Sequence, residues 1–225
     1  MSFEGINSVE LQGELCWPEL KYTNSGKALY KAKVRVPTTD QRSGEDRESY
    51  IRITAWEEFA EFLHSLAPRS RVRVSGRIQE RSFTNRESGR KQSITEIIVN
   101  GAEQVDSEEG INRFHLRGEI VWPDLKEVGE QGTNLFKSKV IIPFFREDDP
   151  ERTTLKRAYV RITAWDELAV GLGDVGEGAV VDVTGHIQER SWTPQTGQDG
   201  RPPQKRIFTD AVVTNFVLAP EVTNV

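Results

Sequence analysis

The stretch "GRIQERSF" at residues 76–83 returns as "GHIQERSW" at residues 185–192. Two other pairs of segments keep the same order along the chain: "GELCWPEL" (13–20) with "GEIVWPDL" (118–125), and "YIRITAWEEFA" (50–60) with "YVRITAWDELA" (159–169). Three matches in a fixed order identify an internal repeat, which must be recognised before single elements are assigned. The chain is therefore predicted to contain two copies of one folding unit.

The two copies divide the 225 residues almost equally. We place a first domain at 1–105 and a second at 111–225. Between them, the segment "DSEEG" (106–110) is predicted to be a short acidic linker. Each domain then has about 100 residues, an ordinary size for an independently folding unit.

Each copy has the pattern of five strands. In the first copy they are expected near 8–17, 28–36, 49–56, 70–80 and 92–100, because apolar and polar residues alternate there between Gly, Asn and Pro breaks. A helix is predicted at 57–66, and its counterpart at 166–176 is expected to be shorter because it contains Gly171 and Gly173. Three strands, a helix and a hairpin form the order of an OB-fold. The predicted fold class is all-β, with two tandem five-stranded OB-fold barrels, each with a short helix between the third and fourth strands.

Alternation also predicts which side chains face away from each barrel core. On the third strand, Ile51, Ile53 and Ala55 are expected to point inward, as are Val160, Ile162 and Ala164 in the second copy. The opposite face of this strand then carries Tyr50, Arg52, Thr54 and Trp56, and in the second copy Tyr159, Arg161, Thr163 and Trp165.

Cations follow the same outward faces on the neighbouring strands. The second strand is predicted to present Lys31, Lys33 and Arg35, and its counterpart Lys137 and Lys139. The fourth strand presents Arg71, Arg73, Arg77 and Arg81, whereas the second copy keeps Arg190 but has Asp182 and His186 in this row. The loops 81–91 and 190–206, which Phe83 and Trp192 open, each hold four Lys or Arg against one carboxylate; the first includes Arg86 and Lys91.

Aromatic rings interleaved with cations on an exposed strand face favour single-stranded nucleic acid. Unpaired bases stack on such rings at about 1–3 kcal/mol each, while cations follow the phosphates. Duplex DNA keeps its base faces inside and would gain little from them. The candidate stacking residues are Tyr50, Trp56, Phe83, Tyr159, Trp165 and Trp192.

Some of these aromatics also have structural interpretations. Trp56 and Trp165 could pack under the following helix, and Phe83 and Trp192 could anchor their hairpins or form dimer contacts. Trp17 and Trp122 each precede a proline at a strand end, and we assign both to core packing.

The composition excludes several other classes of protein. No apolar run reaches the length of a membrane span, and the N-terminus "MSFEGINSVE" does not read as a signal peptide. Cys16 is the single cysteine, and the three histidines have no metal-ligand spacing, so neither a disulfide framework, nor a metal site, nor any other cofactor is expected. No nucleophile–base pair or phosphate-binding glycine loop is evident, which argues against an enzyme. The net charge of −5 is concentrated in two acidic stretches, near 103–109 and 147–151, and the remainder is slightly basic.

These segments together resemble the bacterial single-stranded DNA-binding proteins. The resemblance rests on "VELQGEL", "ELKYTNSGKAL", "YIRITAWEEFAEFL", "VSGRIQERSF" and "TEIIV", and more loosely on "NRFHLRGEI", "YVRITAWDELA" and "GHIQERSW". It implies OB-folds that coat single-stranded DNA without sequence preference in replication, recombination and repair. It also implies stacking on the third strand and on the hairpin after the fourth, where the six candidate rings lie. The loop after the second strand usually holds another stacking aromatic; the first copy lacks it, and the second has Phe144 and Phe145.

Two departures from the family pattern bear on partners. Most members carry one OB-fold and form tetramers, whereas two folds per chain imply a homodimer with four barrels. The chain ends in "VLAPEVTNV" rather than an acidic, Phe-terminated tip, so partner recruitment through such a tip is not expected. The expected location is the cytoplasm of a bacterium, at the nucleoid, or of a host that carries a phage or plasmid copy. Two rival functions stay open: an OB-fold protein-interaction module of a replication or recombination complex, and an RNA-binding OB protein.

Overall fold

The computed structural model of the chain describes residues 3–39, 44, 46–84, 89, 91–145, 151, 154–192 and 206–219. The first half contains β1 (Ile6–Tyr22), β2 (Ala28–Thr39), β3 (Asp46–Trp56), α1 (Glu57–Ser65), β4 (Arg71–Thr84) and β5 (Lys91–Gln104). The second half repeats this order with β6 (Ile111–Val128), β7 (Thr133–Phe144), β8 (Lys156–Trp165), α2 (Asp166–Val175), β9 (Val180–Trp192) and β10 (Arg206–Leu218). Every predicted strand of the first half is present and is longer than predicted, although β4 begins at Arg71, one residue after the predicted start.

Strand pairing closes each half into a barrel. In the first half the hydrogen-bonded order is β2-β3-β5-β4-β1, and β1 pairs again with β2. The second half follows the order β6-β7-β8-β10-β9, and β9 pairs again with β6. The β3–β5 and β8–β10 pairs are parallel, while the other pairs are antiparallel. Each half is thus a five-stranded Greek-key barrel with a helix between its third and fourth strands, as the predicted OB-folds require.

The barrel interiors contain the apolar residues that alternation placed there. Ile51, Ile53 and Ala55 are buried, and so are Val160, Ile162 and Ala164. Thr54 and Thr163 are exceptions to the prediction for the outer face, because both are buried. The Thr54 hydroxyl donates a hydrogen bond of 2.6 Å to the buried carboxylate of Glu96 on β5, so a polar pair covers this part of the outer face.

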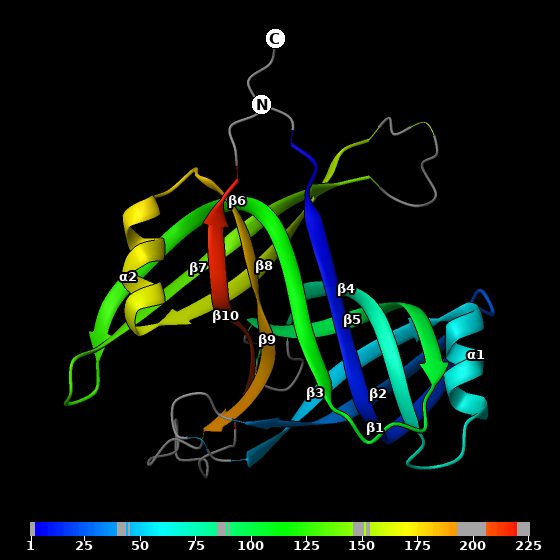
Figure 1. Cartoon of the computed structure of the whole chain (residues 1–225). Helices are drawn as coiled ribbons and strands as arrows, with labels where there is room; N and C mark the ends of the chain where they lie inside the picture. Colours follow the sequence, from blue (N-terminus) through cyan, green and yellow to red (C-terminus); the bar gives the residue numbers. More distant parts are fainter. Residues whose placement is uncertain are drawn as a thin grey trace.

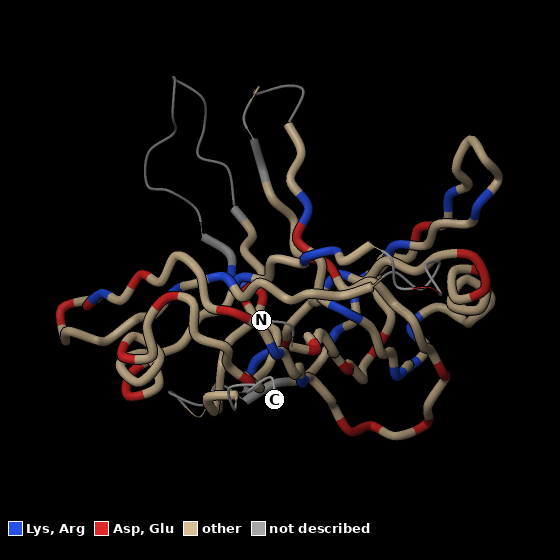
Figure 2. The backbone as a smooth tube through the Cα atoms, turned by 90° about the horizontal axis from the view of Figure 1, so that it is seen from above, with Lys and Arg blue, Asp and Glu red and all other residues tan. Residues whose placement is uncertain are grey.

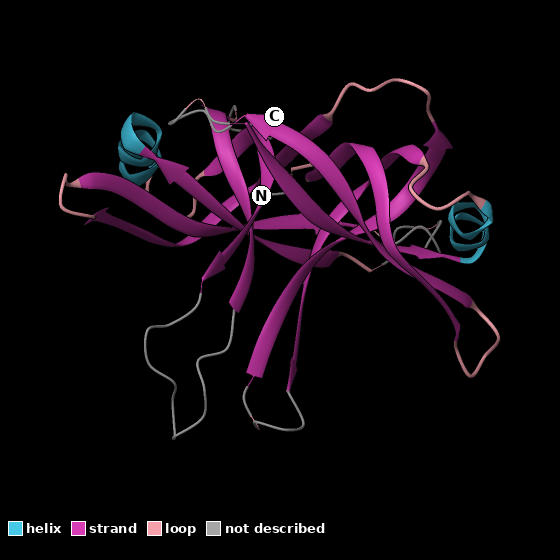
Figure 3. Ribbon diagram, turned by 90° about the horizontal axis from the view of Figure 1, so that it is seen from below, coloured by secondary structure: helices cyan, strands magenta, loops and turns pink. Residues whose placement is uncertain are grey.

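The two helices lie at opposite ends of the molecule (Figure 3). The prediction of a shorter second helix is wrong, since α2 has 10 residues and α1 has 9. Both glycines of α2 lie where another chain segment approaches closely. A Cβ at Gly171 would meet the Phe216 ring at 3.0 Å, and one at Gly173 would meet Leu125 at 2.7 Å. These glycines therefore allow tight packing of α2, and the packing stabilises a helix that its sequence alone would not favour.

The two barrels are joined by the antiparallel pair of β1 and β6, which lie side by side at the centre of Figure 1. The asparagine near the start of each strand binds its own barrel. Asn7 makes two hydrogen bonds of 2.9 Å to the backbone of Ile78, and Asn112 makes two of 2.8 Å to the backbone of Ile187. Both isoleucines begin the repeated "IQERS" segment. The central strands therefore determine where that segment lies in each barrel.

A charged cluster lies between β6 and β9, and its charges are reversed relative to the same place in the first half, where Arg73 binds Gln12 and Glu10. The carboxylate of Asp182 accepts hydrogen bonds from Arg117 at 2.9 Å and from the His115 ring at 2.8 Å. Partial burial acts to raise the pKa of Asp182, but the hydrogen bonds and charges of Arg117 and His115 outweigh it, and the pKa is lowered. The ionised form of Asp182 is thus favoured in the folded chain.

We expect Asp182 to contribute to the acid stability of the fold. Because its pKa is lower in the folded than in the unfolded chain, its contribution is complete above the unfolded value of about 4 and is lost as the pH falls through the folded value. Unfolding by urea, followed from pH 6 to pH 2, should show a steeper loss of stability for the native sequence than for Asp182→Asn. Parallel curves for the two proteins would contradict this assignment.

Candidate nucleic-acid interface

The predicted stacking residues lie on the outer faces of the barrels, and none that the structure describes is buried. Trp56 at the end of β3 is 39 % exposed and Tyr159 on β8 is 38 % exposed. Tyr50, Phe83 and Trp165 are half-buried. The backbone of Trp192 ends β9, and its side chain lies outside the described residues. Sealing beneath the helices, the structural alternative for Trp56 and Trp165, is therefore not observed.

Tyr50 is oriented by a carboxylate on the same strand. Its hydroxyl donates a hydrogen bond of 2.8 Å to Glu48, and this bond is the largest cause of a raised pKa of Tyr50. Glu48 also pairs with Arg35 at 3.0 Å, and Arg35 pairs with Glu14 at 2.5 Å. Arg35 is thus held by two carboxylates, which reduces the charge it offers to a phosphate.

Trp17 and Trp122 are not core residues, and their assignment to core packing is wrong. They are 66 % and 63 % exposed. Each sits in a β-bulge, where the register shifts between Cys16 and Glu19 on β1 and between Val121 and Asp124 on β6. Strand alternation does not hold through a bulge, so it could not place these rings. The repeated Trp-Pro pair was the one available signal.

Each of these rings contacts a predicted stacking residue of the same half. The Trp17 and Tyr50 ring centroids are 5.2 Å apart, and those of Trp122 and Tyr159 are 6.1 Å apart with nearly parallel planes. The Lys33 ammonium lies 5.8 Å from the Trp17 ring centre, within reach of a cation–π contact. The outer face of each barrel therefore carries a pair of adjacent rings at the same place.

The glutamates of the two "IQERS" segments bind cations of the opposite barrel. Glu189 on β9 accepts hydrogen bonds from Lys33 on β2 at 2.7 and 2.9 Å. Glu80 on β4 accepts from Lys139 on β7 at 3.2 Å and from Arg161 on β8 at 3.4 Å. Three predicted phosphate contacts, Lys33, Lys139 and Arg161, are thus paired within the chain. We call these two clusters the crossed ion pairs.

The arginine of each "IQERS" segment is held by a buried carboxylate of its own barrel. Arg81 donates to Glu96 at 2.8 Å, and Arg190 donates through Nε to Asp210 at 2.8 Å. The Arg190 guanidinium also lies 5.9 Å from the Trp165 ring centre. In the first barrel Glu96 also accepts from Thr54, but Asp210 is one carbon shorter than Glu96. The corresponding hydroxyl of Thr163 is buried and has no hydrogen-bond partner among the described residues. Both arginines are thus held in place, and Arg190 lies beside a candidate ring.

The other arginines of β4 have different partners. Arg71 donates to the linker carbonyls of Ser107 at 2.8 Å and Glu109 at 3.0 Å. Arg73 donates to Gln12 at 2.8 Å. Arg77 donates to Gln79 at 3.1 Å and lies 5.7 Å from the ring centre of Phe144 in the second barrel. Arg71 therefore holds the linker, and only part of this row lies beside the rings.

The remaining predicted cations differ in how far the structure describes them. Lys31, Arg52 and Lys137 are half-buried and form no ion pair with any residue that the structure describes. Arg86 lies outside the described residues, and of Lys91 only the backbone is described, at the start of β5. Figure 2 shows Lys and Arg positions interspersed with Asp and Glu positions along the backbone of both halves.

Phe144 and Phe145, at the end of β7, are half-buried and 39 % exposed respectively. Their role in stacking stays a prediction. The arginine contact to Phe144 brings this strand end close to β4 of the first barrel.

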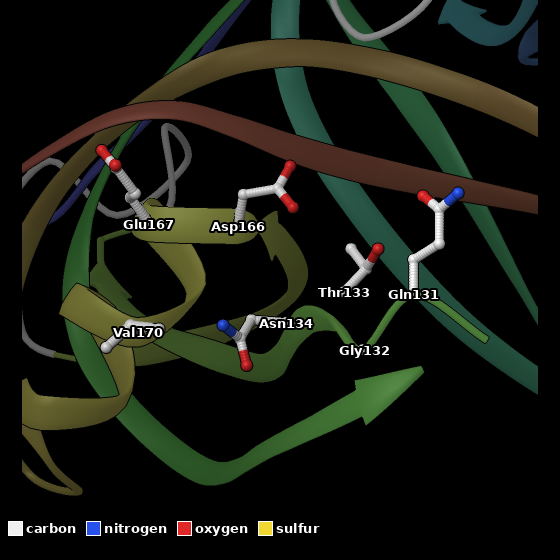
Figure 4. A pocket seen from close by; sticks show the side chains of 7 residues that line it. All are labelled: Gln131, Gly132, Thr133, Asn134, Asp166, Glu167 and Val170. Atoms are coloured by element: carbon white, nitrogen blue, oxygen red, sulfur yellow. The ribbon is translucent and has the colours of Figure 1, made fainter. Parts of the chain in front are cut away.

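A shallow hollow of about 530 Å³ lies between the β6–β7 turn and the start of α2 (Figure 4). Its lining includes the carboxylates of Asp166 and Glu167 but no Lys or Arg. A phosphate would be repelled there, so this hollow is not part of the candidate interface. Within the described residues no cluster of His, Cys, Asp and Glu could hold a metal ion. Neither described helix is long and apolar enough to cross a membrane.

Comparison with known proteins identifies a family whose model matches the first half of the chain. The model of the "Single-strand binding protein family" matches residues 6–106. The "Single-stranded DNA-binding protein" of Mycolicibacterium smegmatis is 40 % identical over 90 residues, which are 36 % of this chain and 53 % of that protein. "Single-stranded DNA-binding protein B" of Bacillus subtilis is 35 % identical over 104 residues, which are 45 % of this chain and 91 % of that protein. The chain thus spans about half the length of the mycobacterial relative and almost all of the Bacillus one.

A solved structure matches both halves together. The wild-type single-stranded DNA binding protein from Thermus aquaticus superimposes with a TM-score of 0.75 over 99 % of this chain and 97 % of that one, at 19 % identity. A deletion mutant of the same protein gives the same TM-score at 22 % identity. At this level of identity the likeness establishes the fold, including the arrangement of two barrels in one chain.

Proposed function

Since this chain belongs to the single-strand binding protein family, we propose that it binds and protects single-stranded DNA without sequence preference. The observation that carries the proposal is that each barrel has both exposed rings and fixed cations on its outer face. Trp56 and Tyr159 are more than a third exposed, and Arg81 and Arg190 are held beside the ring-bearing strands. Bases would stack on the rings, and phosphates would contact the cations.

Phosphate binding is assigned first to cations that pair with no residue in the described part of the chain. Lys31 on β2, Arg52 on β3 and Lys137 on β7 form no ion pair with described residues. The crossed ion pairs would have a different role: they would hold the two barrels in a fixed position relative to each other along the bound DNA strand. We propose phosphate binding also for Arg86, which lies between β4 and β5 in the sequence, and for Lys91 at the start of β5.

We also propose the domain division 1–105 and 111–225, and a homodimer that presents four barrels in replication, recombination or repair within a bacterial cell. The support is the family resemblance and the two barrels per chain. No catalytic role and no cofactor are assigned. Sedimentation equilibrium would test the dimer independently of DNA binding.

The main test is a fluorescence titration with oligo-dT at two salt concentrations. The chain has five tryptophans, and stacking of bases should quench their emission. The logarithm of the affinity should fall with the logarithm of the salt concentration, with a slope of about 0.7 for each phosphate contacted. Oligo-U and duplex DNA are the controls, and both should bind more weakly.

Each result separates this proposal from its rivals. Equal binding of oligo-U would favour an RNA-binding protein, since RNA readers use the 2′-hydroxyl. If none of oligo-dT, oligo-U and duplex DNA binds at low salt, nucleic-acid binding is rejected and the protein-interaction module is favoured.

A further inference from the structure

Trp17 and Trp122 occupy a backbone conformation that is costly for a bulky side chain. Their φ angles are +51° and +53°, in the left-handed region. Such residues cost on the order of 1–3 kcal/mol and persist where the surrounding structure imposes them, often at functional sites. A following proline restricts the backbone further, and both tryptophans precede one. Glycine would adopt this conformation without strain, yet both copies carry the largest side chain.

The strain is not compensated by burial of the ring. About two-thirds of each Trp side chain is exposed, whereas core tryptophans lose most of their surface. The bulge itself is held by other groups: in the second half the backbone N–H of Trp122 donates to Glu177 at 3.0 Å. The indole is thus available at the surface and is not needed to fill the interior.

The surroundings of the two rings favour a ligand that is flat, aromatic and anionic. Tyr50 lies beside Trp17, and Tyr159 lies nearly parallel to Trp122. Lys33, at 5.8 Å from the Trp17 ring centre, and the neighbouring Lys31 belong to β2, which pairs with the bulged strand. A nucleotide offers a base to the rings and a phosphate to Lys31, which forms no ion pair with any described residue; an apolar protein partner would leave that charge without a counterion. Lys33 is already paired with Glu189.

We infer that Trp17 with Tyr50, and Trp122 with Tyr159, form two paired-ring platforms that each take one nucleobase of single-stranded DNA. The inference rests on the proposed function and adds a base-binding position on the first strand of each barrel. Because the platform lies on the bulged strand, it extends the DNA path beyond the third strand and the hairpin.

The test replaces both tryptophans by glycine, Trp17→Gly with Trp122→Gly. Glycine relieves the strain, so the melting temperature should not fall below the native value. The Kd for oligo-dT should rise by at least about 30-fold, given two lost stacking contacts of about 1 kcal/mol or more each. The salt dependence of Kd should keep its slope, because no phosphate contact is removed. Tyr22, which is 63 % exposed on β1 outside the ring pairs, supplies the control, and Tyr22→Ala should change Kd by less than about twofold.

The outcomes distinguish the inference from the proposed function. A folded double variant with native Kd overturns the platforms but leaves single-stranded DNA binding intact. A native chain that fails to bind oligo-dT rejects the proposed function itself. If the glycine variant does not fold, 5-fluorotryptophan is incorporated into the native chain, and the ¹⁹F resonances of Trp17 and Trp122 are assigned with phenylalanine variants. Both resonances should shift with oligo-dT, and unshifted resonances would overturn the inference.

Discussion

Replacing Trp56 and Phe83 together by alanine is expected to weaken oligo-dT binding by about 30-fold or more. Each ring is expected to stack one base, and the loss per base is about 1–3 kcal/mol. Trp56 is 39 % exposed at the end of β3, and Phe83 is half-buried near the end of β4. Neither ring fills the barrel core, so the fold should be retained. Anisotropy of labelled oligo-dT measures the affinity without relying on tryptophan emission.

The matched variant is Trp165→Ala with Trp192→Ala in the second barrel. We expect a smaller loss there, because the fourth-strand row is less basic and has Asp182 where the first barrel has Arg73. Arg190 also covers Trp165 and would have to share that ring with a base. Equal losses in the two variants, or the reverse order, would reject this ranking of the barrels.

Gly76→Ala is expected to destabilise the fold strongly, by at least about 3 kcal/mol, the upper end of the usual range for overpacking. Gly76 is buried on β4 between β1 and β5 and opens the repeated segment. A Cβ there would clash with the carbonyl oxygen of Ile98, and Gly185 meets Val212 in the same way. Backbone cannot move aside as a side chain can, so barrel closure itself would be disturbed. Urea unfolding measures the difference.

Gly101→Ala is the control for this substitution. Gly101 lies on β5, and an added Cβ there would meet only the Ser75 side chain. Since that hydroxyl can rotate away, the loss should stay below about 1 kcal/mol. Similar losses for the two variants would show that the close approach at Gly76 does not limit the packing of the barrel.

The fold was predictable because its signals are local and occur twice. Alternation at Ile51, Ile53 and Ala55 predicted which face of the third strand points into the barrel core. The internal repeat predicted that there are two barrels. Thr54 shows the limit of this reasoning. Its place on the outer face is correct, but its burial depends on Glu96 of a strand about 40 residues away. Alternation assigns a side and says nothing of what covers that side.

The candidate site was only partly predictable, for two physical reasons. Trp17 and Trp122 lie in bulges, where two residues oppose one and alternation fails. The charge of Lys33 is offset by Glu189, which belongs to the other barrel. A pairing between barrels depends on how β1 and β6 meet, and a sequence pattern within one copy holds no information about that.

Because β1 and β6 belong to one chain, the interface between the two barrels need not have identical residues on its two sides, as the interface of a symmetric homodimer must. Two identical subunits must place the same residue on both sides of their shared seam. Here Gln12 and Arg73 occupy one side, while Arg117 and Asp182 occupy the other. Such a surface is asymmetric from one barrel to the other. A single DNA strand, which has distinct 5′ and 3′ ends, therefore meets different residues in its two possible orientations.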